Sequence, residues 1–132
     1  MSLQAEKLAL GLILGSLRSM GWEHYELDDG DGWVFVGDKS IDQVVEDCAA
    51  TDDCGLRMLK DGVGTASMVI IWGNSPSELI ADCSCSHGFE EDVDAAPKAL
   101  WPAWPFVDEA HETEGYLRLQ VHERQVAAAG GV

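Results

Sequence analysis

The chain has 132 residues, and 46% of them are hydrophobic, which is typical of one globular domain that can bury its own core. Asp and Glu number 24 against 8 Lys and Arg, so the formal net charge is −16. This charge excludes the basic surface on which binding to nucleic acid or to an anionic membrane depends, and it favours a basic protein partner.

No internal repeat or linker divides the chain, so we expect one compact acidic domain over residues 1–126 and a flexible tail over residues 127–132. The apolar stretch from Leu8 to Leu17 is too short to span a bilayer, and it lacks the positive flank and cleavage site of a signal peptide. Four cysteines in such a chain indicate a reducing compartment, and we predict a cytoplasmic location.

The first helix is predicted over residues 3–20. Its apolar side chains recur at the spacing of one helical face, at Leu10, Ile13, Leu14 and Leu17. Gly11 and Gly15 lie four residues apart, and each costs helix stability, so we expect both to allow close approach of another backbone. The sheet supplies that backbone in the favoured interpretation. A second copy of the helix supplies it in the alternative, which predicts a homodimer through residues 3–20.

Two strands and a second helix follow. Trp22 to Leu27 and Trp33 to Val36 predict a hairpin, because the residues between them contain the Asp-Gly pairs of tight turns. Ser40 and Gln43 have the spacing of a capping box, which predicts that a helix over residues 40–51 begins here.

The centre of the chain predicts three more strands. Residues 55–60 form the first of them. Met68 to Trp72 is an unbroken apolar run, too short for a buried helix, and it predicts a strand covered on both faces. Gly73 to Pro76 has the composition of a turn, so Leu79 to Cys85 is expected to return as the other half of a central hairpin.

A helix is expected from Phe89 to Leu100. The prolines in Trp101 to Phe106 exclude a helix interior there and predict an extended segment, and Tyr116 to Arg124 fits either a strand or a short helix. The element order is therefore α-β-β-α-β-β-β-α. We predict an α+β fold, with an antiparallel sheet of about five strands and two to three helices packed mainly on one face.

One set of residues has the chemistry of a zinc site. Thiolate and imidazole are the ligands that zinc prefers, and period two would place three of them on one face of a strand: Cys83, Cys85 and His87, with Cys48 or Cys54 as a fourth ligand. The sequence has no Cys-x-x-Cys pair, so the favoured interpretation is that these are reduced cysteines acting as small core residues. A disulfide is expected even less, and we predict no metal and no cofactor.

Signals of catalysis are weak. The carboxylates around Asp29 do not fit a calcium loop, because Trp33 occupies a ligand position. No phosphate loop, dinucleotide fingerprint or nucleophile elbow is present. Asp82 is the one acid in an apolar strand, where burial would raise the pKa of its carboxyl. We assign no catalytic residue and favour a protein without enzymatic activity. The alternative is a small-molecule or metal-binding domain, or an enzyme, built around Cys83, Cys85, His87 and Asp82.

The distribution of acids carries the functional prediction. Two segments, residues 23–53 and 78–114, hold most of the carboxylates and one base each. On a shared face they would imitate the charge of nucleic acid and attract a basic protein, as an inhibitor or adaptor does. In its small size, acidity and lack of catalytic motifs, the chain resembles the accessory proteins of phages and mobile elements.

The predicted partner-binding residues are Asp28, Asp29, Asp31, Asp38, Glu46, Asp47, Glu90, Glu91 and Asp92. Trp101 and Trp104 are predicted as aromatic anchors, although packing on the sheet is the commoner role of tryptophan.

Overall fold

A computed structural model describes residues 3–73 and 78–99. The predictions for Trp101, Trp104, residues 116–124 and the tail at 127–132 lie outside the described residues. The elements run in the order α1 (Leu3–Ser19), β1 (Trp22–Asp28), β2 (Trp33–Phe35), α2 (Ile41–Ala49), β3 (Asp53–Lys60), β4 (Gly64–Ile71), β5 (Ile80–Cys83), the 3₁₀ turn η2 (Ser86–Gly88) and α3 (Phe89–Ala99).

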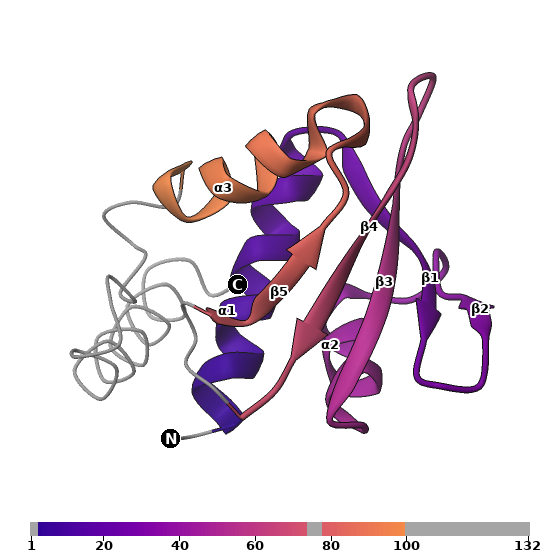
Figure 1. The fold of residues 1–132 in the computed structure, drawn as a ribbon, viewed down its shortest axis with the longest axis vertical. Helices are drawn as coiled ribbons and strands as arrows, with labels where there is room; N and C mark the ends of the chain where they lie inside the picture. The colour runs from indigo at the N-terminus through magenta and orange to yellow at the C-terminus, as the bar shows by residue number, and fades with distance from the viewer. Residues whose placement is uncertain (1–2, 74–77, 100–132) are drawn as a thin grey trace, which may run out of the picture.

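The five strands form one antiparallel sheet in the order β2-β1-β3-β4-β5. Figure 1 shows α1 and α2 behind this sheet and α3 beside its β5 end. The predicted α+β class, the antiparallel sheet and the order α-β-β-α-β-β-β-α are confirmed. No described helix is long and apolar enough to cross a membrane.

The two faces of the sheet differ in burial. On β3 and β4 the side chains that face the helices are buried, at Cys54, Leu56, Met58, Ala66, Met68 and Ile70. The alternate residues of the same strands are half-buried or exposed. Since successive side chains of a strand point to opposite faces, one face carries the core and none of the described helices lies over the other. We call the second side the open face.

The prediction that Met68 to Trp72 is covered on both faces is wrong. Met68 and Ile70 are buried, but Val69 between them is 40% exposed on the open face. A run of apolar residues identifies a strand, yet it does not show whether a second layer lies over it. β-branched residues such as Val69 also suit the exposed face of a strand, so an apolar run does not require cover on both faces.

The first helix is held by its buried face and by long-range hydrogen bonds. Leu10, Leu14 and Leu17 are fully buried in the core. The buried Glu6 carboxylate accepts the Gly73 backbone N–H at 3.0 Å, just beyond β4. A Cβ placed at Gly11 or Gly15 would meet no atom within 4 Å. The expected close approach of the sheet to these glycines is therefore absent from the described part of the chain, and the homodimer stays a prediction.

The start of α2 follows the predicted cap in part. Ser40 has an extended backbone, and its hydroxyl accepts the Gln43 N–H at 3.1 Å. The Gln43 side chain does not return to the Ser40 backbone. It donates instead to Asp47 one turn further on, at 2.9 Å, so half of the capping box is formed.

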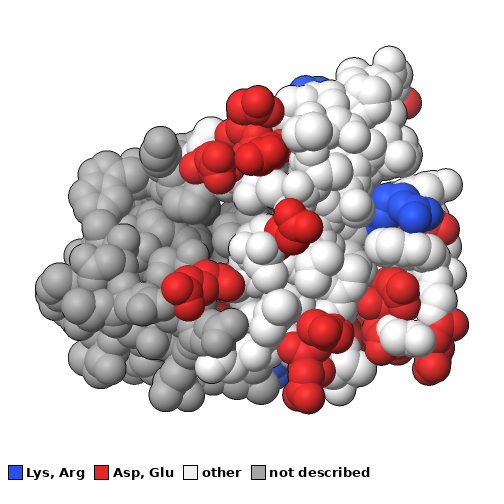
Figure 2. All heavy atoms as spheres, viewed as in Figure 1, with Lys and Arg blue, Asp and Glu red and all other residues white. Residues whose placement is uncertain are grey.

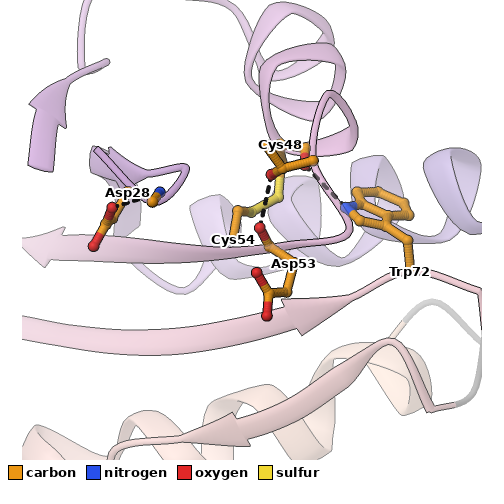
Figure 3. Close-up of a disulfide and its surroundings, with 7 residues drawn as sticks. Asp28, Cys48, Asp53, Cys54 and Trp72 are labelled. Atoms are coloured by element: carbon orange, nitrogen blue, oxygen red, sulfur yellow. Dashed lines mark hydrogen bonds between the residues drawn. A yellow bond between two sulfur atoms is a disulfide. The ribbon is translucent and has the colours of Figure 1, made fainter. Parts of the chain in front are cut away.

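A disulfide joins Cys48 at the end of α2 to Cys54 at the start of β3 (Figure 3). Both cysteines are buried, and the Trp72 indole N–H donates to the Cys48 carbonyl at 2.9 Å. The expectation of four reduced cysteines is wrong, because the turn after α2 brings two core-facing cysteines together. Disulfides persist mainly in oxidising compartments, which weighs against the reasoning that predicted a cytoplasmic location.

Candidate functional site

The predicted zinc ligands do not converge. Cys48 and Cys54 are bonded to each other. Cys83 ends β5 on the core side, opposite Met68, whereas Cys85 is exposed beyond the strand and His87 has a left-handed backbone in η2. The prediction that Cys83, Cys85 and His87 share one strand face is wrong because the strand ends at the first of them. The described residues contain no group of three or more His, Cys, Asp or Glu placed to hold a metal ion.

The chemistry of the Cys83 thiol also differs from that of a metal ligand or nucleophile. Burial raises the pKa of this thiol, and the nearby Glu90 and Asp94 carboxylates raise the pKa further. Metal binding and nucleophilic attack both require the thiolate, which this environment disfavours. Asp82 lies on the open face opposite Val69 and is exposed, and its carboxylate accepts the Cys83 N–H at 2.9 Å. It is therefore not an acid in an apolar pocket.

The predicted acids occupy separate regions of the molecule. Asp28, Asp29 and Asp31 lie at the β1–β2 turn, and Asp28 of β1 pairs with Gly55. The acids of α3 lie near the other end of β1, where Asp92 meets Trp22. The 7 residues of β1 separate these groups by about 20 Å. In Figure 2, carboxylates lie over α3, along β5, at the lower edge of the molecule where β3 begins and over the β1–β2 turn, with mostly uncharged surface over the central parts of β3 and β4.

Three of the predicted partner-binding acids already contact other side chains of the chain. Glu46 pairs with Lys7 at 3.1 Å and Asp47 with Lys39 at 2.8 Å. The hydrogen bond from Lys39, followed by that from Gln43, lowers the pKa of Asp47. Asp92 accepts the buried Trp22 indole N–H at 2.8 Å. These contacts give Glu46, Asp47 and Asp92 structural roles, and a role of these acids in partner binding stays a prediction.

The β1–β2 turn holds a compact group of acids, which we call the acidic turn: Asp28, Asp29 and Asp31. Asp28 Oδ1 accepts the N–H groups of Gly30 and Gly32, at 2.8 and 3.1 Å. Asp29 Oδ1 accepts the Asp31 N–H at 3.2 Å. Each of these two acids uses one oxygen to fix the turn, so the loop conformation itself sets where the negative charge lies. Asp38 is exposed just beyond the other end of β2.

Beside the acidic turn lies an exposed apolar strand, β2, which the sequence predicts only as half of a hairpin. All of β2 is exposed, with Trp33 at 39%, Val34 at 59% and Phe35 at 54%. We call these three residues the aromatic edge, since β2 is one of the two edge strands of the described sheet. Its exposure follows from its position at the edge of the sheet, which the local sequence does not specify.

The aromatic edge is held in place although it is exposed. The Arg57 guanidinium lies over the Trp33 ring, 4.1 Å from its centroid, and donates to Glu26 Oε1 at 2.6 Å. The ring also extends across Gly55, where an added Cβ would come within 3.1 Å of it. Glycine at that position leaves room for the indole to lie flat on the sheet.

The second aromatic side chain is supported in the same way. Phe35 packs edge-to-face on Tyr25, with ring centroids 5.7 Å apart. Tyr25 is the extra residue at a β-bulge in β1. A Cβ at Gly37 would lie only 2.7 Å from the Phe35 ring. Aromatic rings fixed before a partner arrives lose little conformational freedom on binding.

The acidic turn and the aromatic edge can recognise a partner, but they lack the parts of a catalytic site. They offer fixed rings, exposed apolar area and carboxylates, without a nucleophile beside a base. No protein-family model matches the sequence, and neither a curated protein nor a solved structure is similar enough to indicate a family.

Proposed function

We propose that this protein is a small acidic binding domain, an inhibitor or adaptor, that engages a basic protein partner through the acidic turn and the aromatic edge. The observation that carries the proposal is the pair of fixed, exposed rings at Trp33 and Phe35, directly beside Asp28, Asp29 and Asp31. Trp and Tyr anchors surrounded by polar residues are typical of binding hot spots, and exposed aromatic patches mark interaction surfaces.

Electrostatics supports a cationic partner. Two basic side chains close to β2 are already engaged in the described part of the chain: Arg57 pairs with Glu26 and Lys39 with Asp47. The carboxylates of the acidic turn and Asp38 therefore set the local charge. The net charge of −16 adds a long-range attraction that speeds encounter with a cation-rich surface.

The experiment is a pull-down from source-cell lysate at low and high salt, with wild-type protein and a variant carrying Asp28→Asn, Asp29→Asn and Asp31→Asn. Asparagine keeps a side-chain oxygen for the hydrogen bonds of the turn, so the variant removes charge and leaves the loop shape. We expect a basic protein that binds wild type at low salt, is released at high salt, and binds the variant several-fold more weakly.

A matched variant controls for total charge. Glu90→Gln, Glu91→Gln and Asp94→Asn also remove three charges, from exposed positions of α3. This variant should retain the partner nearly as well as wild type. Equal losses in both variants would point to net charge alone, and a partner indifferent to salt would contradict the proposal.

A further inference from the structure

We propose that the partner contributes an extended, basic segment that pairs with the outer edge of β2 as an additional strand of the sheet. This inference rests on the proposed function and specifies how the partner is held. Its basis is the position of β2 as an edge strand whose three side chains are all exposed.

The backbone of β2 is oriented for such pairing. The Val36 N–H donates to the Tyr25 carbonyl at 2.8 Å, toward β1. Because N–H groups alternate in direction along a strand, Val34 also faces β1, whereas the N–H groups of Trp33 and Phe35 point away from the sheet. Within residues 3–73 and 78–99 no strand pairs with this edge of β2, and an edge of this kind accepts a strand from another chain.

Side chains on both faces of β2 would contact an added strand. Trp33 and Phe35 lie on the open face, in register with Asp28 and Glu26. Val34 lies on the helix side, opposite the buried Leu27, yet it is 59% exposed, so the helical layer does not cover it. An incoming strand could therefore bury apolar side chains against rings on one face and against Val34 on the other.

Charge selects the occupant of the edge. The acidic turn lies at one end of β2 and Asp38 at the other, which suits a strand that carries Lys or Arg near both ends. A second copy of this chain is disfavoured, because pairing two β2 edges would bring together two chains that each carry a net charge of −16. A helix would leave the outward N–H groups of Trp33 and Phe35 without backbone acceptors.

The test begins with a random peptide display library selected against the full chain at low salt, with peptides of about ten residues, the length of a strand. We expect enrichment of sequences without proline in which Lys or Arg alternates with apolar residues. The enriched peptides are then measured against Phe35→Pro and Phe35→Ala. Proline removes the outward N–H as well as the ring, and an edge strand tolerates it. We expect about tenfold weaker binding for Phe35→Pro than for Phe35→Ala.

A second measurement leaves the protein unchanged. The best peptide is made with N-methyl groups on one alternate set of its amides, and then on the other set. Methylation of the set that faces β2 should weaken binding about tenfold, whereas methylation of the opposite set should have little effect. This arm decides the question even if Phe35→Pro fails to fold.

Other results separate the two proposals. Basic peptides that bind in a salt-sensitive way but tolerate both methylations would overturn strand pairing and leave the proposed function standing. Selection of uncharged or acidic peptides alone, or of none, would overturn both. A wild-type dimer in sedimentation that Phe35→Pro abolishes would show that the edge pairs with a second copy, and would overturn the choice of partner.

Discussion

Arg57 connects three strands on the open face. Its guanidinium stacks on Trp33 of β2 and bonds to Glu26 of β1, while its own backbone belongs to β3. A planar guanidinium can stack and form an ion pair at once, which a lysine ammonium does less well. The orientation of Trp33 therefore depends on this one side chain.

Replacement of Arg57 tests that dependence. We expect Arg57→Ala to lower the free energy of unfolding by about 1 kcal/mol, since both the stack and the ion pair are partly exposed. Arg57→Lys keeps the charge and should lose most of the stack. Urea unfolding measures stability, and a red shift of tryptophan emission reports release of the indole. An unchanged spectrum in Arg57→Ala would show that Gly55 alone suffices to hold Trp33.

Single residues also show which features of the structure the sequence can predict. Ser40 was correctly assigned as a helix cap, because capping is local chemistry within four residues. Trp22 and Trp33 begin neighbouring strands, yet Trp22 is fully buried and Trp33 is exposed. The difference depends on strand order, since β1 has a neighbour on each side and β2 lies at the edge. Local composition contains no signal of that order.

At the scale of elements, hydrophobic period and turn residues were sufficient to predict the three α-helices and five strands and their order. They did not place β5, which was expected in a central hairpin and lies at the edge of the sheet. Period and turn residues did not predict the contacts between one element and the next. The end of α2 and the start of β3 were expected as separate pieces, and Cys48 and Cys54 as independent thiols. Their pairing depends on the direction in which β3 leaves the helix, with Cα atoms 5.7 Å apart. The exposure of the aromatic edge could not be predicted for the same reason, because it depends on the position of β2 in the assembled sheet.

The disulfide should stabilise the packing of α2 on β3. For a loop with a sequence separation of 6, closure stabilises the fold by about 2 kcal/mol. Cys48→Ala with Cys54→Ala, or treatment with a thiol reductant, should lower the midpoint of thermal unfolding accordingly. Cys85→Ser serves as the control, because Cys85 is an exposed free thiol. Equal midpoints for oxidised and reduced protein would contradict the structural role.

At the scale of the whole molecule, like charge opposes compaction. With a net charge of −16, we expect added sodium chloride to raise the midpoint of thermal unfolding by a few degrees, equivalent to about 1 kcal/mol. The scan is run at pH 7. At this pH the Asp47 carboxylate is ionised, and the hydrogen bond from Lys39 holds the pKa of Asp47 below its usual range.

The α3 variant used above as a charge control serves here as well. With Glu90, Glu91 and Asp94 neutralised, repulsion is weaker, so salt should have a smaller effect on the unfolding midpoint. A midpoint that falls with salt in both proteins would instead mean that local ion pairs such as Lys39–Asp47 outweigh the global repulsion.

The long-range contacts of α1 have a consequence for folding during synthesis. Its contacts reach far along the chain: Glu6 bonds to Gly73 and Ser16 to the carbonyl of Ala96, separations of 67 and 80 residues. A ribosome therefore completes the leucine-rich helix long before it has made the segments that cover it. Until residue 96 is synthesised, part of the apolar surface of α1 lacks the segments that cover it in the native fold. Contacts between residues so far apart in sequence also slow folding. Chaperones that bind apolar helices would therefore have time to bind α1 before the segments that cover it are made.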